Sequence, residues 1–479
     1  MTRHAVLIGA LALVILSLWQ IEAKRPRGVE VASVSIGTTP ATEWRQPGAH
    51  ATVVVAHGFA GSRPLMKAYI WTLVASGYDV VAFDFEGHGL NPVPMSGDTD
   101  SIEGTTRRLV DETVRVMDYA GDAPALLGHS MATDVLIRAA LERPAGPIVA
   151  ISAFSQAVTP QHPENLLLIA GEWEGRLIAF GQDAIRQVDP NAVEGQLLTG
   201  DVTRMALVSP NVEHVGILYA PYALRESIRW LDAAYGVPER EPQLATIGYW
   251  VLALLAGLMA LWRPISGYLP DAPKAEPVPR KAILWCAGVA LVTPLGAIGT
   301  PTGILPVLVA DYLVVHLGFT GLMQLALLRA NAVAFGKFQP VVALALVAWG
   351  LAVFGLAINS YLANFMPHAG RALILAVLIL GAVPFMVADA IATQGGRGPL
   401  WHRLLLRGAF FASLIFAVAL DFDRLFFLVL IAPVILLFFL IFGYMGRWTA
   451  DRAGPLAAGV ALGVILAWSL GVTFPMFAA

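Results

Sequence analysis

The sequence has little charge for its length. Of its 479 residues only 14% are Asp, Glu, Lys or Arg, whereas 57% are hydrophobic. Soluble globular proteins average about 25% charged and about 45–50% apolar residues. The composition therefore excludes a disordered chain and a nucleic-acid-binding protein, and it disfavours an ordinary soluble enzyme.

Cysteine is almost absent as well. The single Cys286 lies inside an apolar run, so no intramolecular disulfide can form. This absence says little about the compartment, because many extracytoplasmic domains lack disulfides. The sequence also shows no internal repeat and no low-complexity tract.

The charge that is present is unevenly distributed along the chain. Residues 24–243 have a net charge of −9 and 43 charged residues among 220, whereas residues 244–479 have a net charge of +6 and 20 among 236. Residues 1–23 hold only Arg3 and Glu22. Two regions in two solvents are predicted: a water-soluble domain over 24–243 and a lipid-embedded domain over 244–479.

Long apolar runs occur at the N-terminus and throughout the second half. The run from residue 5 to residue 21 is either a signal peptide or a membrane anchor, and we favour an uncleaved anchor within residues 1–23 because no clear cleavage site follows it. Eight further runs approach the roughly 20 residues needed to cross a bilayer. They lie near residues 245–262, 282–299, 304–328, 340–358, 371–391, 405–420, 424–443 and 455–475.

The basic residues of the loops predict an orientation. With the N-terminus in the cytoplasm, the loops on that side carry eleven basic residues, and the opposite short loops carry only Arg371 and Arg424. This distribution predicts an integral protein of a bacterial-type inner or plasma membrane, with the soluble domain on the extracytoplasmic side. Lys24, Arg25 and Arg27 argue for the reverse, but the bias repeats over four loops.

Strand-like and helical patterns alternate through the soluble domain. The β-branched run at residues 52–56 is typical of a buried parallel strand, and a helical pattern over 64–76 leads to a second strand at 79–84. A further helix over 101–120 precedes a short strand at 125–128. This alternation predicts a mostly parallel sheet with helices on both faces.

The segment Gly128-His129-Ser130-Met131-Ala132 joins a short strand to a helix. Small neighbours allow the sharp, strained turn that would expose Ser130. With the upstream His57-Gly58-Phe59 and Gly87-His88-Gly89, the segment resembles the nucleophile elbow of the α/β-hydrolase superfamily, in its serine-aminopeptidase-like and monoglyceride-lipase-like branch. The resemblance covers roughly residues 50–235.

Two residues depart from the pattern of that superfamily. Ala132 replaces the last glycine of the elbow motif, and Glu86 stands where the branch usually has a basic residue. Alanine is small enough for the turn. The acidic Glu86 weakens any analogy with the substrates of the branch.

The resemblance implies a catalytic triad in the order serine, acid, histidine. Two histidines follow Ser130 in the soluble domain, His162 and His214, and His214 lies in a loop after the last expected strands. His214 is therefore the expected base. The family pattern of a strand followed by G-x-x-acid places the acid at Glu174, and the alternatives are Glu172, Asp183 and Asp201.

The same resemblance implies acyl transfer, with Ser130 as nucleophile and the backbone N–H groups of Phe59 and Met131 as oxyanion hole. It implies no organic cofactor and no metal, and we interpret His57 and His88 as structural residues of glycine-flanked turns. About ten residues separate the strand expected at 147–155 from the strand that leads to the acid. This spacing leaves no room for a lid domain, so either the site is open or the membrane half covers it.

Together these features predict a membrane-integrated serine hydrolase that cleaves an ester or thioester of a lipidic or amphiphilic substrate. Its expected partners are that substrate and membrane lipids, with no nucleic acid, and its oligomeric state is open. Three alternatives remain: an acyltransferase with a non-water acceptor, a serine peptidase, and a transporter or receptor whose hydrolase-like domain is not catalytic.

Ionisable residues also fall within the expected spans. Asp311 and His316 lie in one span, and Asp389 ends another. Such residues are costly in a bilayer and are often functional. We interpret them as interfacial or paired groups, with a proton or substrate path as the alternative.

Overall fold

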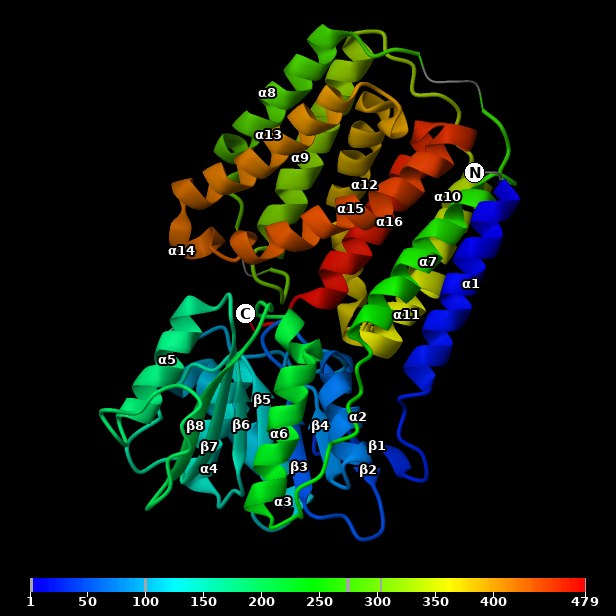
Figure 1. The fold of residues 1–479 in the computed structure, drawn as a ribbon. Helices are drawn as coiled ribbons and strands as arrows, with labels where there is room; N and C mark the ends of the chain where they lie inside the picture. The colour runs from blue at the N-terminus through cyan, green and yellow to red at the C-terminus, as the bar shows by residue number, and fades with distance from the viewer. Residues whose placement is uncertain (1–2, 99–100, 273–275, 302–303, 479) are drawn as a thin grey trace.

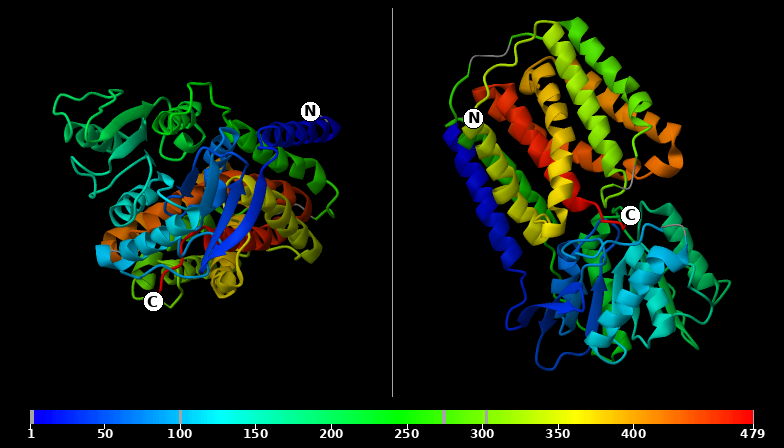
Figure 2. Two further views of the ribbon diagram at one scale, coloured as in Figure 1. Left: turned by 90° about the horizontal axis from the view of Figure 1, so that it is seen from below. Right: turned by 180° about the vertical axis from the view of Figure 1, so that it is seen from behind.

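The computed structural model describes residues 3–98, 101–272, 276–301 and 304–478. Figure 1 shows an α/β region at one end of the molecule and a bundle of long helices at the other. The views in Figure 2 show the same division, with the C-terminus at the junction between the two regions.

The α/β region is built on one sheet of eight strands. The strand order is β1-β2-β4-β3-β5-β6-β7-β8, and every pairing from β4 to β8 is parallel. The strands are β1 Glu30–Ile36, β2 Thr39–Arg45, β3 Thr52–Ala56, β4 Asp79–Phe83, β5 Ala125–His129, β6 Ile148–Ile151, β7 Asn165–Gly171 and β8 Thr203–Ser209. The mostly parallel sheet confirms the predicted fold class.

The antiparallel pair β1–β2 was not predicted. Most side chains of β1 are exposed or half-buried, so the strand lacks the continuous apolar run of a central strand. The two strands are joined at Gly37, which has a positive φ of +61°. An exposed hairpin at the sheet edge leaves a weaker sequence signal than the buried strands do.

Helices cover both faces of the sheet because alternate strand residues point to opposite sides. In β3, Val53 and Val55 join one core and Val54 and Ala56 the other. Helices α2 and α6 cover the first face, and α3, α4 and α5 cover the second. The bounds are η1 Arg63–Met66, α2 Lys67–Ala75, η2 Ile102–Thr106, α3 Arg107–Ala120, α4 Met131–Glu142, α5 Gly175–Arg186, η3 Gly216–Tyr219 and α6 Pro221–Ala234.

Among the described residues, nine helical segments are long and apolar enough to cross a membrane, close to the predicted runs. One of them is continuous from α10 through η4 to α11. The bundle consists of α1 Arg3–Glu22, α7 Gly248–Ser266, α8 Arg280–Ala297, α9 Ala310–Ala330, α10 Pro340–Ala348, η4 Trp349–Phe354, α11 Gly355–Tyr361, η5 Ala369–Arg371, α12 Ala372–Ala392, η6 Gln394–Gly396, α13 Leu400–Leu420, α14 Phe422–Leu425, α15 Leu428–Ala453 and α16 Pro455–Thr473.

Helix α9 begins later than the apolar run at 304–328 predicts. The carboxylate of Asp311 accepts hydrogen bonds from the backbone N–H groups of Ile304 and Leu305. Val309, just before the helix, has a left-handed φ of +57°. The polar first turn therefore holds the preceding residues in a loop, although hydropathy alone would include them in the span.

The carboxyl edge of the parallel sheet faces the bundle. Asp84, just after β4, accepts a hydrogen bond of 3.0 Å from the Asn364 amide of the bundle. The backbone N–H of Met476, beyond α16, donates to the Gly87 carbonyl at 2.9 Å. Because open α/β sheets carry their binding sites at this edge, the site region lies toward the bundle (Figure 2).

Candidate active site

Ser130 lies on the sharp turn between β5 and α4. Its φ of +55° and ψ of −120° place it in a region that non-glycine residues rarely adopt. A Cβ on Gly128 would come within 2.6 Å of Leu136 and 3.1 Å of the Ala132 methyl group. Positions 128 and 132 must therefore stay small, and alanine at 132 is compatible with the packing.

Ser130 begins a chain of three hydrogen-bonded side chains. Its Oγ lies 2.8 Å from Nε2 of His214, and Nδ1 of His214 lies 2.5 Å from Oε1 of Glu174. With a neutral imidazole protonated at Nδ1, the serine donates to the histidine and the histidine donates to the carboxylate. The structure thus brings together the three residues that the sequence predicted for the triad.

Glu174 is held by two further donors. Its Oε2 accepts hydrogen bonds from the Ser152 hydroxyl at 2.7 Å and from the Gly171 N–H at 2.6 Å. Burial alone would raise the pKa of Glu174, but the hydrogen bonds from His214, Gly171 and Ser152 outweigh it and lower the pKa below its ordinary value. Glu174 is therefore a carboxylate at neutral pH.

The other candidate residues lie elsewhere. Glu172 accepts a hydrogen bond of 2.7 Å from the Asn211 N–H. Asp183 and Asp201 are exposed on the surface. His162 binds the carbonyl of Ile137 through Nε2 at 3.0 Å.

His129 contributes to the site in a way that the sequence analysis missed. Its Nε2 lies 2.8 Å from the backbone carbonyl of His214. Burial, aided by the nearby His214, lowers the pKa of His129 to about 4, so it stays neutral at pH 7 and donates that hydrogen bond. It occupies the variable position of the elbow motif. The only sequence signal for this role is that the side chain at that position is an aromatic ring with a hydrogen-bond donor.

Phe59 and Met131 are both close to Ser130 along the chain or in space: Met131 follows it directly, and Phe59 follows Gly58, where an added Cβ would come within 3.0 Å of the Ser130 Cβ. Phe59 follows β3, and Met131 is the first residue of α4. Within the described parts of the chain, neither backbone N–H has a protein acceptor. Both donors are therefore available to an oxyanion.

The buried His57 and His88 support the turns beside Phe59. Nδ1 of His57 lies 2.8 Å from the Gly58 carbonyl, and Nδ1 of His88 lies 2.9 Å from the Glu86 carbonyl. Burial lowers the pKa of both imidazoles. Across the described ranges, no group of three or more His, Cys, Asp or Glu side chains is placed to hold a metal ion.

A cavity of about 590 Å³ opens beside Ser130 and His214. One wall includes the segment of η2, and the floor includes the ion pair of Asp134 with Arg138. The apolar lining consists of Ile102, Leu109, Met131, Val135, Phe154 and Leu177. The cavity is large enough for a small organic substrate, and all of its lining residues belong to the α/β region.

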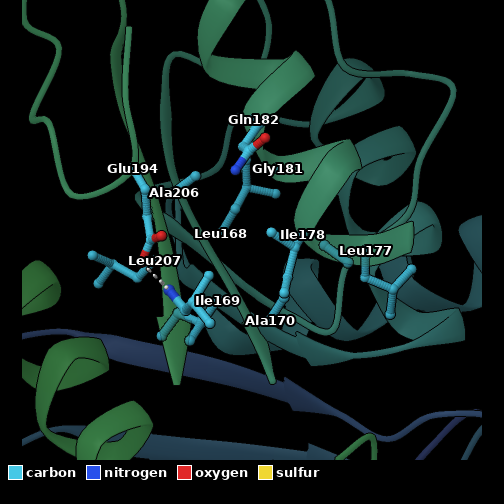
Figure 3. Close-up of a pocket in the computed structure, with 12 residues that line it drawn as sticks. Leu168, Ile169, Ala170, Leu177, Ile178, Gly181, Gln182, Glu194, Ala206 and Leu207 are labelled. Carbon is cyan, nitrogen blue, oxygen red and sulfur yellow. Dashed lines mark hydrogen bonds between the residues drawn. The ribbon is translucent and has the colours of Figure 1, made fainter. Parts of the chain in front are cut away.

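A second cavity lies between α5, β7 and β8 and is drawn in Figure 3. Its apolar wall includes Leu168, Ile178 and Leu207, and the Glu194 carboxylate accepts a hydrogen bond from the Val208 N–H at 3.1 Å. Its volume of about 10 Å³ has room for about one water. None of the candidate site residues lines it.

Comparison with known proteins agrees with this fold. Residues 47–211 match the family model of serine aminopeptidase, S33. This match covers about a third of the chain and lies within the α/β region, which has an α/β-hydrolase fold. A comparison with curated proteins found no match.

Solved structures of several hydrolases are similar to part of this chain. A predicted CIB-like hydrolase from Thermoplasma acidophilum is 14% identical, with 43% of this chain and 99% of that chain covered and a TM-score of 0.35. A dienelactone hydrolase from Anabaena variabilis is 19% identical, with 44% and 98% covered and a TM-score of 0.32. A hormone-sensitive lipase from a metagenome library is 15% identical, with 49% and 99% covered and a TM-score of 0.32.

Proposed function

We propose that this chain is a membrane-integrated serine hydrolase that cleaves an ester or thioester of a lipidic or amphiphilic substrate. The observation that carries the proposal is the hydrogen-bonded series of Ser130, His214 and Glu174 on a strained elbow. Two unpartnered backbone donors lie beside the nucleophile, and a cavity adjoins it. This combination is the minimum that acyl transfer through a serine needs.

In the first half of the reaction, Ser130 Oγ attacks the carbonyl carbon while Nε2 of His214 takes its proton. The Phe59 and Met131 N–H groups stabilise the oxyanion of the tetrahedral intermediate. When the intermediate collapses, the bond to the leaving oxygen or sulfur breaks, and His214 returns the proton to that atom. The acyl group is now an ester of Ser130.

In the second half, His214 takes a proton from water as the water oxygen attacks the acyl-enzyme. The bond to Ser130 Oγ breaks, the serine regains a proton from His214, and the carboxylic acid leaves. Glu174 stays ionised throughout and stabilises the imidazolium that forms twice in the cycle. Replacing water by an alcohol in this half would yield an acyltransferase instead.

The proposal includes a place in the membrane. Residues 1–23 would form an anchor and residues 244–479 a polytopic domain of eight spans, with the hydrolase domain 24–243 on the extracytoplasmic face. The eleven-to-two bias of basic loop residues supports this orientation. The contacts of Asp84 and Gly87 with the bundle support a site that faces the membrane surface, where a lipidic ester is found.

Labelling with a fluorophosphonate probe tests the nucleophile in the full-length protein. We expect the wild type to be labelled and Ser130→Ala to be unlabelled. Ser101→Ala is the matched control, because Ser101 lines the same cavity without contacting His214. Labelling that persists in Ser130→Ala would contradict the assignment.

Hydrolysis is distinguished from acyl transfer by product analysis. We expect free acid as the main product from long-chain esters, with or without an added alcohol. If an added alcohol captures most of the acyl group, the chain is an acyltransferase.

A further inference from the structure

A cavity of about 140 Å³ lies in the bundle between α12, α13, α15 and α16. Helix α12 begins beside Arg371, which donates to the Gly87 carbonyl of the α/β region, and the pocket lies near the other end of this helix, at Asp389. We name it the distal pocket and define it by five polar residues of its lining, Asp389, Arg403, Arg407, Tyr444 and Arg447. By volume it has room for several waters or one small polar group.

Positive charge is in excess in the distal pocket. Asp389 is the only acidic residue of the lining, and both of its oxygens accept from Arg407, at 3.2 Å from Nε and 2.9 Å from Nη2. Among the described residues, neither Arg403 nor Arg447 has a hydrogen-bonded or ion-paired partner, and Nε of Arg403 is buried without an acceptor.

The nearest other acidic residue along α15 does not balance this excess. Asp451 is paired with Arg397, outside the pocket lining. Within the described ranges, the half-buried guanidinium groups of Arg403 and Arg447 therefore have no carboxylate paired with them, and Asp389 alone faces three arginines. Such an arrangement is costly unless an anion completes it.

The shape of the distal pocket fits a ligand with a charged head and an apolar tail. Leu440 and Tyr444 on its rim are 57% and 49% exposed on the outer face of α15. Gly443, also in the lining, has no side chain between that face and Arg407. The pocket therefore opens sideways, along the surface that the proposed membrane arrangement exposes to lipid.

We propose that the distal pocket binds the phosphate group of an anionic membrane lipid. Guanidinium groups match phosphate oxygens with paired donors, and basic pockets between membrane helices are suited to anionic head groups. The inference rests on the membrane arrangement of the proposed function but not on its chemistry. The lipid would sit on the opposite side of the membrane from the hydrolase site.

Native mass spectrometry of the full-length protein in a nonionic detergent tests the proposal. The probes are phosphatidylglycerol, phosphatidylcholine and inorganic phosphate, each titrated separately. We expect the wild type to retain phosphatidylglycerol at least tenfold more tightly than phosphatidylcholine. The double variant Arg403→Gln/Arg447→Gln should lose at least tenfold in its affinity for phosphatidylglycerol.

Arg329→Gln is the matched control. Arg329 lies in the last turn of α9, is exposed, and does not line the pocket. It should bind phosphatidylglycerol like the wild type. Arg403→Lys/Arg447→Lys, which keeps the charge, should retain more affinity than the glutamine variant, and this result separates loss of the site from loss of the fold.

Two results would overturn the proposal. One is equal binding of phosphatidylglycerol by the wild type and by the glutamine variant. The other is arginine-dependent binding of inorganic phosphate without binding of phosphatidylglycerol, which would assign the pocket to a soluble anion. Neither depends on hydrolase activity, so failure here is distinct from failure of the proposed reaction.

Discussion

The α/β region and the helical bundle accommodate buried charge in different ways. In the α/β region, Glu112 accepts hydrogen bonds from Thr39, from Asn91 and from the backbone N–H of Glu86. In the bundle, Asp389 is satisfied by the side chain of Arg407. The loops at a sheet edge have free backbone donors, whereas helix interiors use theirs internally.

This difference determines where each region has hydrogen-bond donors available for a reaction. The backbone N–H of Gly171 joins the side chains of His214 and Ser152 in holding Glu174 as a carboxylate, and the N–H groups of Phe59 and Met131 remain free in the same region. In the bundle, Asp311 also uses backbone donors, but these lie in the loop before α9. Asp389 and Arg371, within or beside the helices, depend on a partner side chain and on carbonyl groups.

The largest effect is expected from Glu174→Gln. The amide cannot stabilise the imidazolium of His214, and loss of the corresponding carboxylate in serine proteases costs about 10⁴ in kcat. We expect kcat for a soluble ester to fall by roughly 10³–10⁴. Steady-state kinetics measure the loss, and thermal unfolding verifies that the variant is folded.

Glu172→Gln is the control for this variant. Glu172 lies two residues before Glu174 but only accepts the hydrogen bond of Asn211. Its kcat should stay within about twofold of the wild type, since exposed polar contacts contribute little. If Glu172→Gln has the larger effect, the acid has been assigned to the wrong residue.

Much of the hydrolase site could be predicted from local sequence signals. Three signals each lie at the end of a strand of the sheet. They are the small residues around Ser130, the apolar run before Glu174, and His214, the single histidine of the α/β region after β8. The role of His129 could not be predicted, because its hydrogen bond to His214 joins two loops that are remote in sequence. The exposed β1 and β2 also gave no apolar run to detect.

The bundle was predicted by composition, but its contacts were not. Apolar runs locate helices without showing which faces meet. The pairing of Asp389 with Arg407, and the two arginines left without a counter-charge, depend on how α12, α13 and α15 pack. Likewise, hydropathy cannot predict the hydrogen bond that the Asn364 amide donates to Asp84.

Glu112 gives the α/β region a pH dependence of stability. Burial raises its pKa to about 7, despite the hydrogen bonds from Thr39, Glu86 and Asn91. A raised pKa in the folded state means that folding takes up a proton. The contribution of protonated Glu112 to the free energy of unfolding is therefore complete below the ordinary carboxyl pKa of about 4.3. It is lost as pH rises to about 7. The change amounts to at most about 4 kcal/mol.

Thermal unfolding at pH 5 and pH 8 measures this effect. The melting temperature of the wild type should fall more between the two values than that of Glu112→Gln, which cannot titrate. Glu239→Gln, on the exposed surface, should behave like the wild type. Equal pH dependence in the wild type and in Glu112→Gln would exclude proton uptake at this residue.

Arg371 connects the two regions through carbonyl groups. Its guanidinium is only 1% exposed and donates to Gly471 and Phe474 of the bundle side and to Gly87 of the α/β region. In Arg371→Met these hydrogen bonds are lost, at about 1.5–3 kcal/mol for bonds to a charged group. We expect the amides of Met95 and Met476 to exchange hydrogen at least tenfold faster.

Hydrogen exchange followed by mass spectrometry measures that change. Arg424→Met is the control, because Arg424 is exposed and donates to Thr300 within the bundle. Unchanged exchange at Met476 in Arg371→Met would show that the remaining contacts alone join the two regions.

The smallest expected effect concerns a contact between the bundle and the oxyanion hole. The ring of Phe427, next to α14, lies 5.9 Å from the ring of Phe59, whose backbone N–H is a proposed oxyanion donor. An aromatic pair contributes about 0.5–1.5 kcal/mol. If the contact positions that donor, kcat/KM in Phe427→Ala should fall roughly two- to tenfold.

The fall in kcat/KM should be the same for short and long acyl esters, because an oxyanion donor contacts the carbonyl oxygen of every substrate. A fall restricted to long chains would instead place Phe427 on the path of the acyl group. Phe422→Ala is the control, since its ring contacts Phe426 and not Phe59. If Phe427→Ala matches the wild type on both esters, the bundle does not position the oxyanion hole through this contact. The Phe59 donor would then be positioned within the α/β region without help from Phe427, and the contacts of Arg371 and Asn364 would join the two regions without shaping the oxyanion hole through this ring.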